Sequence, residues 1–139
     1  MTDFIEATDI INNMVTEAWD TSNPLEYQDL RLANIPSAEQ AWGRVSIQHD
    51  IFGQAGFGDG TAGKLYGREG TLTVQIFTPI NDGMTTSQQI AVALINAFEG
   101  KKDSTGTIWF RKTYIREIGN SGGHFQTNFL TTFVYSHTK

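Results

Sequence analysis

Residues 58–64 read GDGTAGK, the spacing in this chain that most resembles a chemical motif. The first six residues satisfy G-x-G-x-x-G, and the run through Lys64 satisfies G-x-x-x-x-G-K. Both patterns hold phosphates on backbone amides where a strand leads into a helix. The second pattern also needs Ser or Thr after the lysine to bind magnesium, but Leu65 follows here. Because the next segment is predicted to be a strand, neither motif has the helix that it requires.

The other polar residues form no catalytic or metal-binding pattern. His49, His124 and His137 are separated by whole predicted elements, with no Asp or Glu at ligand spacing. Ser121 and His124 have the types of a nucleophile and its base, but a glycine-rich turn is a poor platform and no orienting acid is evident. The chain has no cysteine, which excludes thiolate metal sites and cysteine nucleophiles. We therefore expect no catalytic residues, no metal and no cofactor.

Length and charge narrow the class of protein further. The 139 residues suit a single domain over 1–139 with one core. The net charge of -5 and the scattered Lys and Arg disfavour a general nucleic-acid binder, because phosphate contacts need clustered positive charge. No run approaches the roughly 20 apolar residues that cross a bilayer, and no signal peptide is recognisable. We expect a protein that acts away from membranes and can fold in a reducing cytoplasm.

A strand and a helix between Gly67 and Gly100 organise the chain. Apolar and polar residues alternate over Thr71–Ile76, the period of a strand with one buried face. From Thr85 the apolar residues repeat every three to four positions, which predicts an amphipathic helix. Gly100 is placed to end that helix in a left-handed conformation.

The same patterns predict the remaining elements. They are a helix over Asp3–Trp19, strands over Trp42–His49, Thr107–Ile118 and Phe125–Tyr135, and a short strand within Leu25–Leu32 of the first long connection. Residues 52–67 hold six of the 14 glycines and are predicted to form a flexible loop, and residues 119–124 a hairpin loop. The order indicates an α+β domain: a single antiparallel sheet of about four main strands, with two helices packed on one face.

Aromatic residues are expected on both faces of the strand Thr107–Ile118. Strict alternation places Trp109 and Arg111 on one face, and Phe110 and Tyr114 on the other. Helices on one side would leave the second aromatic face exposed, as in a protein interface, unless the first connection covers it. The sequence leaves these two arrangements open.

Several ordered segments resemble a known protein family. An arginine and a glycine precede a strand reading VQIFTP, a helix closes on FEG, and a REIG segment is followed by a last strand reading NFLTTFVY. In this order they resemble the tail terminator family of long-tailed (siphovirus-like) bacteriophages, the group related to minor tail protein U. The resemblance covers about Trp42 to Tyr135. The positions that match are Arg68, Gln75, Phe77 and Pro79 in the central strand, and Arg116, Glu117, Ile118 and Gly119 in the third-strand segment.

The resemblance implies a structural protein and not an enzyme. Such proteins form a six-membered ring on the head-facing end of the tail tube, stop tube polymerisation and offer a surface for joining the head. The implied partners are further copies of the chain, the tail tube protein and a head completion or connector protein. The implied location is the head–tail junction of the virion, after assembly in the host cytoplasm. DNA would pass through the lumen without specific binding, because acidic walls repel phosphates.

We expect the ring and tube contacts to use the sheet edge and the loop at residues 52–67. The candidate interface residues are Phe57, Lys64, Tyr66, Arg68, Trp109, Arg111 and Arg116. One alternative of the same class is another head–tail joining protein, since fold alone does not separate such proteins. An alternative of a different class is a small-ligand or nucleotide-binding domain that uses the glycine loop as a lid over the sheet.

Overall fold

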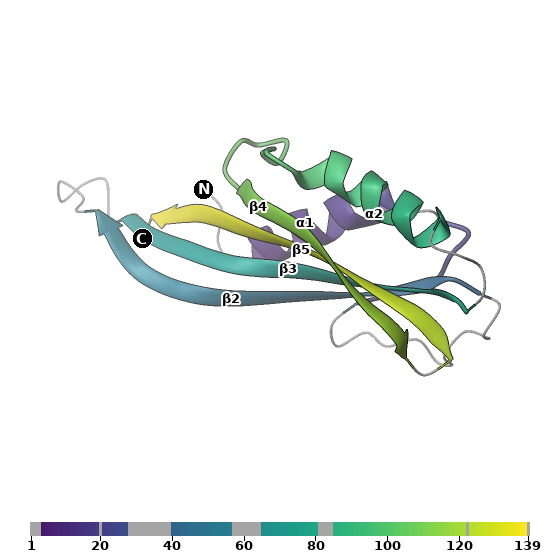
Figure 1. The fold of residues 1–139 in the computed structure, drawn as a ribbon. Coiled ribbons are helices and arrows are strands. Elements are labelled where there is room, and N and C mark those ends of the chain that lie inside the picture. Colours follow the sequence, from purple (N-terminus) through teal and green to yellow (C-terminus); the bar gives the residue numbers. More distant parts are fainter. Residues whose placement is uncertain are drawn as a thin grey trace.

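A computed structural model describes the backbone of residues 4–19, 21–27, 40–56, 65–80, 85–121 and 123–138. Side chains are described for residues 5–19, 21–27, 40–50, 67–80, 85–120 and 123–136. In chain order the elements are α1 (Phe4–Ala18), β1 (Leu25–Tyr27), β2 (Trp42–Gly56), β3 (Leu65–Pro79), α2 (Thr85–Phe98), β4 (Trp109–Ser121) and β5 (His124–Thr138). They form one sheet of order β1-β2-β3-β5-β4, in which β3 is central (Figure 1).

The predicted α+β class is confirmed, with one sheet and two helices. The sheet has five strands and is mixed, because β1 pairs in parallel with β2 while the other neighbours are antiparallel. A parallel neighbour needs a long connection, and residues 28–41 supply it. The short strand expected within Leu25–Leu32 is β1, Leu25–Tyr27.

Both helices cover the same face of the sheet (Figure 1). On α1 the buried positions Ala7, Ile11 and Val15 recur at the period of an amphipathic helix. On α2 the corresponding residues are Ala91, Leu94 and Phe98. The strand residues that meet them are Val45, Leu72, Val74, Ile76, Phe110, Phe129 and Phe133. As predicted, α2 is followed by Gly100 in a left-handed conformation, with φ of 65°.

Two glycines allow large aromatic rings to lie directly on the sheet. A Cβ atom at Gly43 would stand 2.5 Å from the Trp19 indole, and one at Gly70 would stand 2.6 Å from the Phe133 ring and 2.3 Å from the carbonyl oxygen of Gln48. Any side chain at these positions would displace the ring or the backbone. Gly43 therefore allows the Trp19 ring to approach the sheet, and Gly70 makes room for the Phe133 ring of the neighbouring strand.

The prediction of a loop over residues 52–67 is wrong in its extent. Strand β2 continues to Gly56 and β3 begins at Leu65, with Phe52 opposite Arg68 and Gln54 opposite Tyr66. Backbone pairing does not need apolar side chains, so the glycine-rich composition concealed these strand ends. The ends of β2, β3 and β5 run past the helices and curl toward the helix side (Figure 1). Residues 57–64 lie outside the described part of the chain.

The hairpin between β4 and β5 is also tighter than predicted. Strand β4 runs through Ser121 and pairs it with His124, so the turn holds two residues where a loop over residues 119–124 was expected. Gly123 has φ of 90°, and Gly119, with φ of 101°, lies at a bulge within β4. Both conformations favour glycine.

Candidate interaction surface

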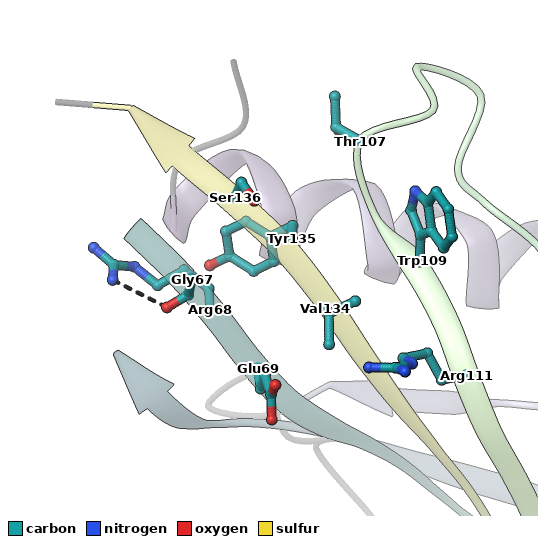
Figure 2. Close-up of a pocket in the computed structure, with 9 residues that line it drawn as sticks. All are labelled: Gly67, Arg68, Glu69, Thr107, Trp109, Arg111, Val134, Tyr135 and Ser136. Atoms are coloured by element: carbon teal, nitrogen blue, oxygen red, sulfur yellow. Dashed lines mark hydrogen bonds between the residues drawn. The ribbon is translucent and has the colours of Figure 1, made fainter. Parts of the chain in front are cut away.

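Three of the predicted interface residues meet at one place in the fold. Arg68, Trp109 and Arg111 line an open hollow of about 510 Å³ where β4 begins beside β5 and β3 (Figure 2). The remaining lining residues are Gly67, Glu69, Thr107, Val134, Tyr135 and Ser136. Residues from β3, β4 and β5 are thus brought together by strand pairing, although they are far apart in sequence.

The hollow lies at a step in the sheet edge. Strand β4 begins at Trp109, opposite Val134, whereas β5 continues to Thr138 in register with β3. Among the described strands, none therefore flanks β5 beyond Val134 on the β4 side. An open strand edge offers backbone hydrogen-bonding groups to another chain.

Trp109 is the most prominent apolar side chain of the step. Half of its surface is exposed (50%), which is unusual for so large a side chain. The Lys102 ammonium lies 4.0 Å from the centre of its ring, within the range of a cation–π contact. Next to it, the Phe110 backbone amide donates to the Lys101 carbonyl at 2.9 Å, which ties the start of β4 to the preceding loop.

Asp103 organises that loop. Its buried carboxylate accepts the backbone amides of Thr107 and Ile108 at 2.8 Å each, and the backbone amide of Thr105 at 3.2 Å. The Thr105 hydroxyl also donates to it. Burial by itself raises the pKa of Asp103, but the hydrogen bonds together outweigh burial and lower the pKa below its ordinary value. The carboxylate thereby fixes the turn that leads into Trp109.

A bulge changes which aromatics share a face of β4. Arg111 and Lys112 together stand opposite Thr132, so the register shifts between Phe110 and Thr113. As a result Phe110 is buried against the helices, whereas Tyr114 pairs with Leu130 on the opposite face and is 38% exposed. The expectation that Phe110 and Tyr114 share a face was therefore wrong, because strict alternation does not hold across a bulge.

The other predicted interface residues have different positions. Arg68 is only 7% exposed and lies opposite Tyr135, so it supports the hollow from within the sheet. Arg116 is exposed and pairs with Asn128, away from the hollow. The backbone of Tyr66 pairs within β2–β3–β5, but its side chain lies outside the described part. Phe57 and Lys64 also lie outside the described residues.

The outer face, which is the sheet face opposite the helices, is covered at its other end. Trp42 and Phe77 are buried there and stack with ring centres 4.3 Å apart. The Arg44 guanidinium lies over both rings and its Nε is 2.6 Å from a carboxylate oxygen of the buried Glu26. One end of the outer face is therefore buried, whereas the other end carries the exposed aromatic residues Trp109 and Tyr114.

His124 belongs to this covered end. It is buried, its ring meets those of Trp42 and Phe77 edge-on, and its Nε2 lies 3.1 Å from the Gln40 carbonyl oxygen. This cluster was not predicted from the sequence. Alternation in β2 and β3, which places Trp42 and Phe77 on the face opposite Val45 and Ile76, was the signal that could have found it.

The fold also bears on the nucleotide-binding motif, on metal binding and on membrane-spanning helices. Residues 58–64 are followed by β3, which begins at Leu65, so the glycine motif leads into a strand and not into a helix. Within the described residues there is no cluster of three or more His, Asp or Glu able to hold a metal ion. No helix in the same part of the chain is long and apolar enough to cross a membrane.

Comparison with known proteins supports the fold. No family model matches the chain, and no curated protein matches it in sequence. One solved structure, which carries no functional name, has a TM-score of 0.64 at 16% identity and covers 95% of this chain and 97% of its own. Another is the sheath/tube terminator of an extracellular contractile injection system, PVC, in its extended state. It has a TM-score of 0.46 at 12% identity, and the match spans all of this chain but 58% of that protein. At these identities the likeness concerns the fold alone.

Proposed function

We propose that this chain is a structural tail-assembly protein of the tail terminator type. It forms a six-membered ring on the head-facing end of a tail tube, stops tube polymerisation and presents a surface for joining the head. The observation that supports this most is the order of the resembling segments. VQIFTP, FEG, REIG and NFLTTFVY fall in β3, at the end of α2, in β4 and in β5, which pack together as one unit.

The proposed partners are copies of the chain itself, the tail tube protein and a head completion or connector protein. The proposal includes no catalytic activity and no cofactor. It places the protein at the head–tail junction of a virion after assembly in the host cytoplasm. DNA crosses the ring without specific binding, and the net charge of -5 is compatible with a wall that repels phosphates.

Subunit and tube contacts are proposed at the stepped sheet edge. An interface needs apolar area as well as polar groups, and the half-exposed Trp109 supplies it beside an open strand edge. Arg111 lies next to it on the same hollow. Trp and Arg are the residue types that most often anchor protein interfaces.

Tube growth in vitro provides the test. Purified tail tube protein is polymerised with and without this chain, and tube lengths are measured by negative-stain electron microscopy. The proposal predicts short tubes with an added ring at one end. Trp109→Ser should weaken this capping, whereas Val92→Ser, which changes a side chain of similar exposure (52%) on α2, should not. Tubes of unchanged length without end rings would contradict the proposal, and end rings on tubes that keep growing would indicate a head–tail joining protein instead.

A further inference from the structure

The exposed charges of the described chain are unevenly distributed. All of its exposed basic side chains lie between Lys101 and Arg116, since Arg44 is paired with Glu26 and Arg68 is buried. The exposed acidic side chains are spread over α1, β2, β3 and the ends of α2 and β4. A cationic stripe on β4 and its preceding loop is therefore set against an otherwise acidic protein.

On the outer face, acidic and basic side chains come close together. A second hollow, of about 400 Å³, is lined by Asp50 and Glu69 at one side and by Arg111 and Lys112 at the other. Glu69 and Arg111 also share the first hollow. In Figure 2 the Arg111 side chain extends toward Val134, and Glu69 lies on β3 beyond it. Two strand spacings separate β3 from β4, or about 10 Å.

None of these four charges forms an ion pair within the described part of the chain, although the Asp50 carboxylate raises the pKa of the neighbouring His49. Neither Arg111 nor Lys112 makes an ion pair with any described carboxylate; the ion pair formed by described residues is that of Arg44 with Glu26. The described contact to the Asp50 carboxylate is a long hydrogen bond of 3.4 Å from the Thr71 hydroxyl. The acidic pair and the basic pair are thus available to a partner.

A partner with charge of one sign does not fit this surface. Nucleic acid would gain from Arg111 and Lys112, but Glu69 in the same hollow would repel its phosphates. Every copy of this chain carries both signs, so the basic pair of one copy can meet the acidic pair of another. We propose that the acidic pair Asp50–Glu69 of one copy binds the basic pair Arg111–Lys112 of the next copy.

The proposed contact is heterologous, because the acidic pair of each copy meets one neighbour and its basic pair meets another. Strand β4 forms the edge of the sheet, while Asp50 and Glu69 lie on its face over β2 and β3. The edge of one copy thus overlaps the outer face of the next, and repetition of the contact closes a ring where the rotation allows it. The half-exposed Trp109 and Tyr114 on the same strand add apolar contact. The inference rests on the proposed ring and names the contact that builds it.

Charge reversal tests the inference. One variant carries Arg111→Glu and Lys112→Glu, the other Asp50→Lys and Glu69→Lys. Self-association of each is measured by sedimentation velocity across a concentration series, against the wild-type chain. Each variant is expected to lose association on the order of 10- to 100-fold, because like charges then face each other. An equimolar mixture of the two should regain most of it, since opposite charges meet at every contact between unlike variants.

A matched control is available on α1. Asp9→Lys with Glu17→Lys changes two exposed carboxylates and shifts the net charge as much as the acidic-pair variant does. It should associate like the wild-type chain. Variants that associate normally, a mixture that regains nothing, or a wild-type chain that is monomeric at every concentration would each overturn the inference. Binding of duplex DNA by the wild-type chain, lost in the basic-pair variant and strengthened in the acidic-pair variant, would also overturn it.

The tube-growth measurement separates this inference from the proposed function. If the variants still cap tubes as well as the wild-type chain does, the function holds and the contact is wrong. If the wild-type chain associates through these charges but never shortens tubes, the contact holds and the tail-terminator function is wrong. Circular dichroism of each variant confirms that the comparison concerns folded protein.

Discussion

The two faces of the sheet differ in how far their side chains are buried. The helix face is filled with side chains from both helices and four strands, and Leu72, Phe129 and Phe133 are fully buried there. The outer face is divided: Trp42 and Phe77 are buried at one end, whereas Trp109 and Tyr114 are half-exposed at the other. The helix face therefore maintains the fold, and the exposed end of the outer face is free to bind.

This difference also separates stability from assembly. Burial of apolar surface is the main source of folding stability, so residues of the helix face should govern unfolding. Exposed side chains contribute little to folding but can contribute much to an interface. Substitutions of aromatic residues on the two faces can be compared to test whether folding stability depends on the helix face alone.

The largest expected effect comes from one such pair. Phe129→Ala removes a fully buried ring that touches Phe98, and it should reduce the free energy of unfolding by about 3–5 kcal/mol. Tyr114→Ala, on the outer face, should reduce it by no more than about 1 kcal/mol. Urea unfolding of both variants, followed by circular dichroism at low protein concentration, makes the comparison. Equal losses would mean that the exposed end of the outer face belongs to the core.

The helix face was largely predictable from the sequence. Alternation in β3 and the three-to-four repeat in α2 identify buried positions directly, because the burial of one side of an element imposes its period on the sequence. The α+β class follows from that order of elements. The parallel pairing of β1 was not predictable, because three residues carry too little pattern to reveal a partner.

The outer face was less predictable, because its arrangement depends on register. The bulge at Arg111 and Lys112 reverses the faces of the β4 residues between it and the second bulge near Gly119, and no local sequence pattern predicted it. The convergence of Arg68, Trp109 and Arg111 likewise depends on pairing between strands that are distant in sequence. Residue type suggested Trp109, Arg111 and Arg68 as interface candidates; the first two are exposed, but residue type did not reveal that Arg68 is buried.

A second prediction concerns the loop that contains Asp103 and leads into β4. Asp103→Asn replaces a carboxylate that accepts several hydrogen bonds with an amide that cannot accept them all, and should cost about 1–3 kcal/mol of unfolding free energy. The loop leads directly into Trp109, so the variant should also make that indole more accessible to a fluorescence quencher. Unchanged stability would show that the loop holds its shape without the carboxylate.

The pH dependence of Asp103 has a defined sign. Its pKa is lower in the folded chain than in the unfolded chain, so its contribution is complete above the unfolded value, about 3.9, and is lost as the pH falls through the folded value. The wild-type melting temperature should therefore fall more steeply below pH 4 than that of Asp103→Asn. Parallel curves for the two proteins would contradict the assignment.

The smallest effect is expected at His49, on the helix face where the strands leave the helices. Its ring meets Phe133 and Tyr135 edge-on, with centres 5.3 and 5.8 Å apart. Burial lowers the pKa of His49, the Asp50 carboxylate raises it, and the Arg68 guanidinium lowers it again, with a net decrease. The unfolded chain, whose histidine pKa is about 6.5, then binds a proton more readily than the folded chain. Stability should therefore decrease as the pH falls below that value, until the folded pKa is passed.

His49→Gln removes this titration and sharpens the contrast between the two faces. The wild-type chain should lose unfolding free energy between pH 7.5 and 5.5, and the variant should lose less, because the group that binds the proton on unfolding is gone. Urea unfolding at both pH values, at a concentration where the chain is monomeric, measures the difference. An identical loss in the two proteins would assign the pH dependence to other groups and would show that the ring cluster at the end of the helix face tolerates a charge.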